Sequence, residues 1–139
     1  MTVLFDWREY YLYKDEILAN KVKLSQNELR ILISRFYYCA FNLSFIYLTQ
    51  VLNIDFPESI PGSQARTNKH KWVPFELGKL DFQNQTRANK LNSLRIKRNE
   101  ADYETNKLFN IGDYSFAEKC CKDFISAYEK DIFGNSISN

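Results

Sequence analysis

The chain is poor in the residues that many-stranded folds and many functional sites require. It has 139 residues, of which only four are Gly, three Pro, three Cys and one His. The scarcity of Gly and Pro, together with long periodic segments, disfavours a sheet of short strands and favours helices. Since 45% of the residues are hydrophobic, a folded core rather than a disordered tail is expected. We therefore expect an all-α protein, an antiparallel bundle of four to five helices forming one domain over residues 1–139.

Metal, cofactor and disulfide chemistry have little support in this composition. Cys39, Cys120 and Cys121 are odd in number and lack the spacing of a metal site, so we expect reduced thiols in the core. The one histidine, His70, has no second histidine and no Ser or Cys partner at a recognisable spacing, which favours a surface or capping role. No Gly-rich phosphate loop occurs. We expect no bound metal and no cofactor.

The opening residues, MTVLFDWREYY, lack the basic segment and the apolar run of a secretory signal, so a cytoplasmic protein is expected. Residues 36–54 carry no charge and approach the length of a membrane span. Polar residues interrupt this stretch, including Asn42, Thr49 and Asn53, and no comparable second stretch follows. A central helix that is buried on most sides, or partly against another subunit, is the better interpretation, and no membrane association is expected.

Periodic apolar positions predict five helical segments. The last segment has the clearest stripe, from Ala117 through Phe124 to Ile132. Residues 55–66 contain two prolines and a glycine, which predicts a loop of a length that often borders functional sites. The predicted helical segments are 5–19, 25–52, 67–80, 85–103 and 113–133, with residues 134–139 as a frayed tail.

Boundary signals accompany these segments. Ser25 followed by Glu28 matches a capping box, in which each side chain satisfies a backbone N–H that the helix cannot. Pro74 and Gly78 interrupt the third segment, which predicts two short pieces with a bend. The other predicted caps are Asp6, Asn84 or Thr86, and Asp113, and Gly134 is predicted to end the last helix.

An arginine and an aspartate share the face by which the predicted helix 85–103 should pack. In the stretch LNSLRIKRNEADY, Leu91, Arg98 and Asp102 lie along one face at about 100° per residue. Long charged groups occupy such a face when they are paired, or when they line a groove or a subunit seam. Arg98 either pairs with Asp102 one turn on, or binds a phosphate or carboxylate, which its planar donors suit. The candidate site residues are Arg98, Asn99, Asp102 and Tyr103.

Positive charge is concentrated in the middle of the chain, although the net charge is only +2. Residues 63–98 carry nine Lys or Arg and two Asp or Glu, whereas residues 99–139 carry four and eight. A basic stretch of this kind is typical either of a solvated surface or of a phosphate-binding face. In the second interpretation, the residues that contact nucleic acid are Arg35, His70, Arg87, Lys90, Arg95 and Lys97.

Two stretches together resemble the HEPN domain proteins of bacteria and archaea. Residues 33–41, ISRFYYCAF, resemble the ISRxYYAxF helix of that family, and residues 98–103, RNEADY, resemble its RNxADY helix. His70 and Val73 resemble a weaker family segment, HxxV. The likeness covers about residues 6–128 in the order of the elements.

The resemblance implies a fold and a set of partners. The family fold is a bundle of four or five helices that dimerises through the helices that carry these motifs, with the paired RN motifs facing a shared cleft. Family members are metal-independent ribonucleases of toxin–antitoxin, antiviral or CRISPR-associated systems, or non-catalytic proteins that bind RNA or nucleotides. A homodimer that binds RNA or a nucleotide is therefore implied, with a nucleotidyltransferase or another defence protein as a further partner.

One position departs from the ribonuclease pattern. In the nuclease branch, a histidine stands five positions after the arginine and helps to activate the ribose 2′-hydroxyl, whereas this chain has Tyr103 there. A tyrosine with an ordinary pKa of about 10 is a poor base at pH 7. The resemblance implies that Arg98 holds phosphate, Asn99 orients the ribose or scissile group and Asp102 fixes the arginine, with binding favoured over cleavage. The alternative is a non-catalytic subunit in which these residues form a polar seam with a second protomer or a partner.

Overall fold

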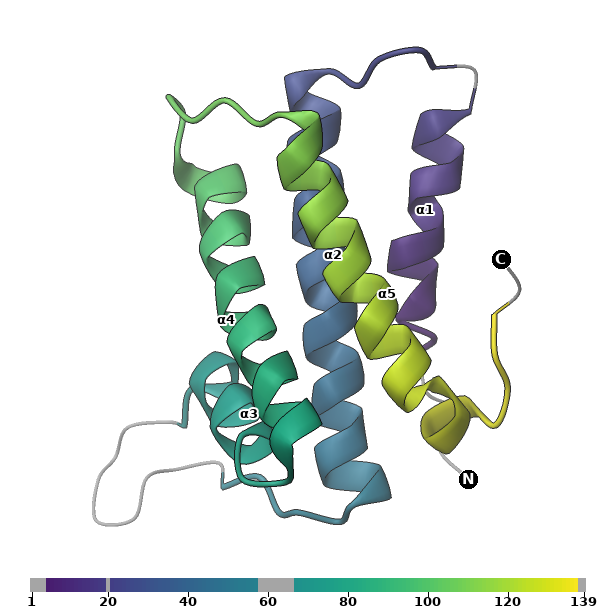
Figure 1. Ribbon diagram of the computed structural model, residues 1–139, viewed down its shortest axis with the longest axis vertical. Coiled ribbons are helices and arrows are strands. Elements are labelled where there is room, and N and C mark those ends of the chain that lie inside the picture. Colours follow the sequence, from purple (N-terminus) through teal and green to yellow (C-terminus); the bar gives the residue numbers. More distant parts are fainter. Residues whose placement is uncertain (1–4, 20, 58–66, 138–139) are drawn as a thin grey trace.

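The computed structural model describes residues 5–19, 21–57 and 67–137, and all regular structure within these ranges is helical. Five helices pack together (Figure 1), and the described ranges contain no strand, so the expectation of an all-α protein is confirmed. A π-helical turn, Tyr47–Val51, continues the second helix directly. The helices are α1 (Arg8–Leu18), α2 (Gln26–Ile46), α3 (Lys69–Leu77), α4 (Phe82–Tyr103) and α5 (Ile111–Phe133).

Helix α2 is the central element of the fold. Figure 1 shows α2 between α1 and α4, with α5 packed across it, and its contacts with α5 and α4 are the most extensive between helices. Helix α3 lies at the opposite end of the bundle from the turns that join α1 to α2 and α4 to α5. Side chains of α2 can therefore contact residues of the other helices that are far away in the sequence.

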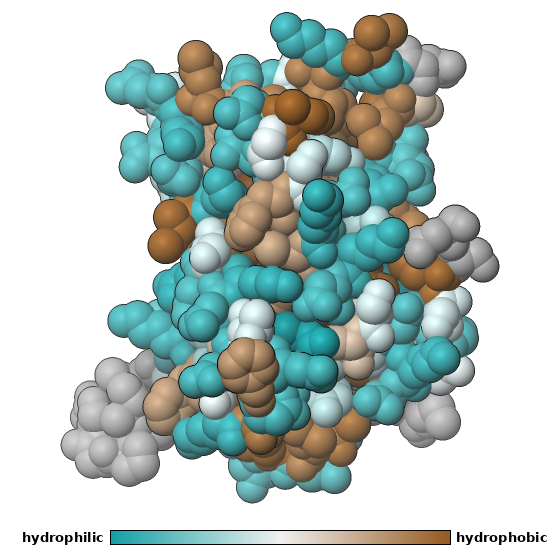
Figure 2. Space-filling view, viewed as in Figure 1, coloured by the Kyte–Doolittle hydropathy of each residue, from teal (hydrophilic) through white to brown (hydrophobic). Residues whose placement is uncertain are grey.

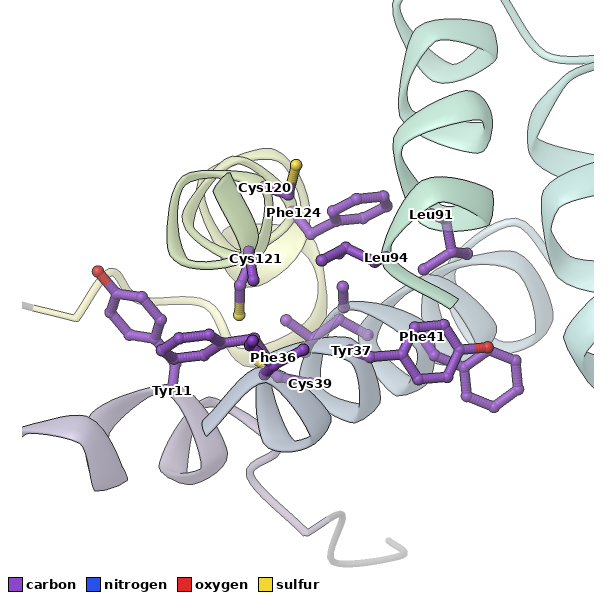
Figure 3. Close-up of a cluster of buried hydrophobic side chains, with 14 of the residues drawn as sticks. Tyr11, Phe36, Tyr37, Cys39, Phe41, Leu91, Leu94, Cys120, Cys121 and Phe124 are labelled. Carbon is purple, nitrogen blue, oxygen red and sulfur yellow. The ribbon is translucent and has the colours of Figure 1, made fainter. Parts of the chain in front are cut away.

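The core is aromatic and continuous between four of the helices. Figure 3 shows side chains of α1, α2, α4 and α5 converging, among them Phe36, Leu94 and Phe124, which are fully buried. Cys39, Cys120 and Cys121 are free and buried in the same cluster, as the composition predicted, and burial raises the pKa of the Cys120 and Cys121 thiols.

Reciprocal capping boxes begin α2 and α5. The backbone N–H of Glu28 donates to Ser25 Oγ (3.1 Å) and that of Ser25 donates to Glu28 Oε1 (2.9 Å), which confirms the prediction for α2. Asn110 caps α5 and Asp113 is its reciprocal partner, whereas Asp113 was predicted as the cap itself. Gly134 ends α5 in the left-handed conformation (φ +79°), as predicted.

Several boundaries differ from the sequence predictions. Helix α1 begins at Arg8, and the Asp6 carboxylate accepts the Arg8 backbone N–H (3.0 Å) without being the N-cap residue. Helix α3 is one helix that contains Pro74 and has Gly78 as its C-cap, not the two pieces that were predicted. Of the predicted loop 55–66, residues 58–66 lie outside the described ranges.

Helix α4 starts earlier than its apolar pattern predicted. Asp81 is the cap, with its Oδ1 accepting the Asn84 backbone N–H at 2.8 Å, so neither Asn84 nor Thr86 caps the helix. Asn84 is instead buried, where Tyr128 of α5 donates a hydrogen bond to its side-chain carbonyl. The prediction failed because the first turn, Phe82 to Gln85, is solvent-facing except for Asn84 and shows no apolar period.

A buried ion pair joins the two ends of the chain. Arg8 donates through Nη1 to Glu129 Oε1 (2.8 Å) and binds Asp6 through Nε and Nη2 (2.9 and 2.8 Å). The same groups hold the residues after α5, because Arg8 donates to the carbonyl of Asn135 (3.2 Å) and Glu129 accepts the N–H of Ile137 (2.8 Å). Two residues of the predicted frayed tail are thus held by hydrogen bonds.

On length and composition alone, one described helix could cross a membrane. It is Gln26–Val51, which consists of α2 and the turn after it, and 61% of its apolar window is buried inside the protein. A core helix covered by its neighbours passes the same criterion, so this finding is weak evidence for a membrane span.

Candidate functional site

Arg98 is held in one position by residues of two helices. Its Nη2 donates to the hydroxyl of Tyr38 on α2, and its Nη1 donates to Asn99 Oδ1 (2.5 Å). Its Nε lies 3.2 Å from Asp102 Oδ2, one turn along α4, and the Arg98 side chain is 13% exposed. The predicted pairing of Arg98 with Asp102 is present, and the pair stands at the contact between α4 and α2.

The guanidinium is not fully satisfied by these neighbours. The Nε–Oδ2 contact with Asp102 lacks the angle of a hydrogen bond, and Arg98 Nε is a buried atom with no hydrogen-bond partner among the described residues. Burial by itself would lower the pKa of Arg98, but the hydrogen bond with Tyr38 and the charge of Asp102 outweigh burial and raise that pKa. Arg98 is a permanent cation with donor capacity to spare.

Three tyrosine rings surround this cation. The Arg98 Cζ atom lies 4.9 Å from the ring centroid of Tyr38, 5.6 Å from that of Tyr37 and 6.0 Å from that of Tyr103. Such contacts attract the guanidinium to the ring faces and add to its fixation. Tyr103 is 73% exposed, so the site has one aromatic face open to solvent.

His70 belongs to the same cluster, although it comes from α3. Its Nδ1 is 2.6 Å from the Tyr37 hydroxyl, and its ring stacks on Phe41 with centroids 4.4 Å apart and planes at 16°. The side chain is half-buried, so His70 is partly exposed at the surface while its ring packs against α2. Asn68, not His70, caps α3, and its side chain accepts the His70 backbone N–H.

The surroundings of His70 favour its neutral form. Burial lowers the pKa of His70, and the charges of Arg95, Arg98 and Lys69 lower it further. Burial also raises the pKa of Tyr37, so that its hydroxyl keeps its proton across the physiological range. An uncharged imidazole therefore sits in a positive potential, hydrogen-bonded to a protonated tyrosine.

A groove runs beside the Arg98 cluster, between α1, α2 and α4. Its volume is about 600 Å³, and Tyr38 and Asp102, two residues that hold Arg98, form part of its wall. We call it the central groove. The side chains that line it also include Tyr10, Ser34, Arg35 and Tyr103.

Arg35 and Arg95 are the predicted cations whose charges remain available. The Arg35 guanidinium lies over the rings of Tyr10 and Tyr13, at 4.8 and 4.5 Å, at the edge of the central groove. No carboxylate of the described residues lies within ion-pair distance of Arg35 or Arg95. Arg95 acts on the cluster through its charge, which contributes to lowering the pKa of His70.

Three other predicted cations lie close to carboxylates of α5. Arg87 Nε lies 3.1 Å and Lys90 Nζ 3.9 Å from Asp123, and Lys97 Nζ lies 2.8 Å from Asp113. Both aspartates belong to α5, so the basic middle of the chain packs against its acidic last third. The structure does not bring these three cations into the Arg98 cluster, because they face α5.

Sequence reasoning did not include Arg30 or Tyr38 among the candidate site residues. Tyr38 is a direct partner of Arg98. Arg30 binds backbone carbonyls at the end of α4, with Nη1 2.8 Å from that of Ala101 and Nη2 2.8 Å from that of Glu104 and 2.5 Å from that of Lys107. Tyr38 lies inside the motif 33–41 and Arg30 lies three residues before it, but nothing in a sequence shows which helix a side chain will meet.

No protein-family model, curated protein or solved structure matches this chain. Within the described ranges, no group of three or more His, Cys, Asp or Glu side chains is placed to hold a metal ion. The arrangement at Arg98 has the chemistry of an oxyanion site, since it offers a fixed guanidinium, an exposed amide on Asn99 and an open aromatic face on Tyr103.

Proposed function

We propose that this chain is a HEPN-like helical protein that binds RNA, or a nucleotide phosphate, at Arg98. It acts as a cytoplasmic homodimer in a toxin–antitoxin, antiviral or related regulatory system. One observation carries the proposal: Tyr38, Asn99 and Asp102 hold the Arg98 guanidinium, and two of these residues, Tyr38 and Asp102, also line a groove of about 600 Å³. The resemblance of residues 33–41 and 98–103 to the HEPN motifs supplies the family.

A guanidinium fixed before the ligand arrives suits a phosphate. Arginine presents planar donors that match two phosphate oxygens, and a held side chain loses less conformational entropy on binding than a free one. The exposed amide of Asn99 supplies a further donor. Arg95 adds a second positive charge, because it lowers the pKa of His70 together with Arg98.

The central groove supports a nucleic-acid ligand over a bare anion. Tyr10, Tyr38 and Tyr103 line it, and tyrosine rings stack on unpaired bases without sequence preference. Ser34 lines the same wall and offers a hydroxyl that can bond to a ribose or a base edge. Single-stranded RNA, whose bases are free to stack, fits this combination better than a duplex.

Binding is favoured over cleavage by the placement of the possible bases. Cleavage without metal requires a group that takes the proton of the ribose 2′-hydroxyl while the 2′-oxygen attacks phosphorus and the 5′-oxygen leaves. Tyr103, at the position of the nuclease histidine, is largely exposed, and His70 stands on α3 with its Nδ1 engaged by Tyr37. If cleavage occurs, its products end in a 2′,3′-cyclic phosphate.

A second candidate function is a structural subunit whose Arg98 region forms an interface. The exposed apolar side chain of Ile96 and the exposed ring of Tyr103 favour it, since both lie on α4, two residues before Arg98 and five residues after it. Arg98 and Asp102 would then form a polar seam with a second protomer or with a partner such as a nucleotidyltransferase or another defence protein.

Replacing Arg98 by Ala separates the two candidates. The matched control is Lys122→Ala, which removes one exposed cation on α5 and leaves α4 unchanged. RNA binding is measured by the fluorescence anisotropy of a labelled single-stranded RNA, and mass by light scattering after gel filtration. Loss of charge-assisted hydrogen bonds worth about 1.5–3 kcal/mol should weaken binding by about tenfold to a hundredfold in Arg98→Ala, with the dimer intact.

The results for the Arg98 variants distinguish RNA binding from an interface role. Arg98→Lys keeps the charge but not the planar fork, and we expect it to recover only part of the affinity. A monomeric Arg98→Ala protein would support the interface candidate. If the unmodified protein binds neither single-stranded RNA nor a nucleotide, RNA binding at this site is excluded.

A further inference from the structure

A second groove lies at the end of the bundle where the α1–α2 turn meets the α4–α5 turn, far from α3 (Figure 1). Its volume is about 560 Å³, and we call it the end groove. Its apolar wall is formed by Leu18, Leu24, Leu29, Phe109 and Tyr114. Grooves of this size and lining are typical of places where apolar groups of a ligand or partner are received.

Exposed aliphatic side chains stand around this groove. Val22 is fully exposed, Leu108 is 76% exposed and Ile111 is 68% exposed. Val22 and Ile111 line the groove, and Leu108 precedes its wall residue Phe109. Figure 2 shows hydrophobic residues gathered at the surface of this end of the molecule. A cluster of large apolar side chains on two separate turns is typical of an interaction surface.

The turn that displays Leu108 is held rigidly. The Gln26 side chain accepts the Phe109 backbone N–H (2.8 Å) and donates to the Phe109 carbonyl (2.7 Å). Arg30 donates to the carbonyl of Lys107 on the other side (2.5 Å). Hydrogen bonds to the backbone on both sides of Leu108 therefore hold this residue in place, while its side chain remains exposed to solvent. Such preorganisation lowers the entropy cost of binding a partner.

The lining of the end groove is positive. It includes Lys21 and Lys23 and no acidic residue. Lys21 pairs with Glu28 outside the lining (2.6 Å), and Lys23 has no ion pair among the described residues. The first residues of α2 and α5 and the last residue of α1 also line the groove. Two helix N-termini, which favour negative charge, therefore outnumber one C-terminus, which favours positive charge.

We propose that the end groove is a docking surface for an amphipathic segment of a partner protein. The segment places large apolar side chains in the groove, and its acidic residues face Lys21 and Lys23. A flat lipid surface would leave a concave hollow of about 560 Å³ unfilled. A small ligand that fills the hollow would leave Val22 and Leu108 exposed outside it, whereas a peptide segment covers both the hollow and its rim.

The test is a random peptide library displayed on phage and selected against the full-length protein. Affinities of the selected peptides are then measured for Leu108→Ser, for Lys23→Glu and for a control, Phe82→Ser, which removes an equally exposed apolar side chain at the opposite end of α4. All three positions are exposed, so we expect folding to be retained, which a thermal unfolding scan checks. Selected peptides should combine large apolar with acidic residues.

We expect Leu108→Ser and Lys23→Glu each to weaken these peptides by about tenfold or more, and Phe82→Ser to leave them unchanged. Selection that yields no peptide, or only peptides indifferent to Leu108→Ser, overturns the proposal. Binding of the protein to vesicles of phosphatidylserine that depends on Leu108, in the absence of any such peptide, assigns the surface to a membrane instead. None of these outcomes depends on RNA binding at Arg98.

Discussion

Removal of the Arg8 side chain should destabilise the whole fold, because it leaves the Glu129 carboxylate without its cation. The side chains of Arg8 and Glu129 are only 5% and 7% exposed, and their atoms Nη1 and Oε1 are 2.8 Å apart. The same guanidinium lies 4.2 Å from the ring centroid of Phe133 and binds the carbonyl of Asn135. A single substitution therefore affects α1, α5 and the residues after α5.

The magnitude follows from burial. Breaking a buried ion pair by deleting one partner costs about 3–5 kcal/mol, and most of this is the penalty of the unpaired charge that remains. We expect Arg8→Ala to lose about 3–5 kcal/mol of unfolding free energy near pH 7. Arg8→Met combined with Glu129→Leu should recover most of the stability, since an apolar pair of similar volume removes the buried charge.

Urea unfolding followed by circular dichroism measures these differences. With an m-value of about 2 kcal/mol/M, the expected loss lowers the urea midpoint by about 2 M. Lys14→Ala is the control, because Lys14 pairs with the exposed Asp15 and such pairs contribute less than about 1 kcal/mol. If Arg8→Ala loses no more stability than Lys14→Ala, or if the double variant is less stable than Arg8→Ala, the reasoning from burial is wrong.

Three further predictions concern a cap and two titrations. Asn110→Ala removes the N-cap of α5 and should cost about 1 kcal/mol in the same urea assay, whereas Asn110→Asp should cost little; equal losses would contradict the capping role. Arg95→Ala removes a cation near His70, so the pKa of His70 measured by NMR should rise toward its ordinary value of about 6.5, and an unchanged pKa would show that Arg95 is too far away. Burial alone would raise the pKa of Asp6, but hydrogen bonds from Arg8 lower it, so ionised Asp6 stabilises the fold above its unfolded pKa of about 3.9. This contribution is lost as the pH falls further, so the difference in unfolding free energy between the unmodified protein and Asp6→Asn should shrink in that range. A difference that is independent of pH would refute the assignment.

The helices could be predicted from the sequence where local signals decide them. The capping box of Ser25 and Glu28 and the end of α5 at Gly134 depend on residues within one turn of each other, and both predictions are confirmed. The start of α4 was placed too late because Asn84 is buried by Tyr128, more than forty positions away in the chain. Contacts of that kind leave no periodic signal.

The candidate site shows the same limit. The i, i+4 spacing predicted the contact of Arg98 with Asp102, whereas the contact of Arg98 with Tyr38 depends on how α4 meets α2. Arg87 and Lys97 were grouped with Arg98 because they share its helix and its charge. Their aspartate partners on α5 are assigned by packing, which composition cannot reveal.

Arg30 gives the last turn of α4 a positive charge that its own sequence does not supply. That turn contains no basic residue, yet the Arg30 guanidinium binds carbonyls of Ala101, Glu104 and Lys107 from across the bundle. The same guanidinium therefore sets the geometry of the helix end that carries Asp102 and of the turn that displays Leu108. In a scan for loss of function, Arg30 variants would be defective at both surfaces at once, since Arg30 lines the central groove and also holds the carbonyl of Lys107, next to Leu108.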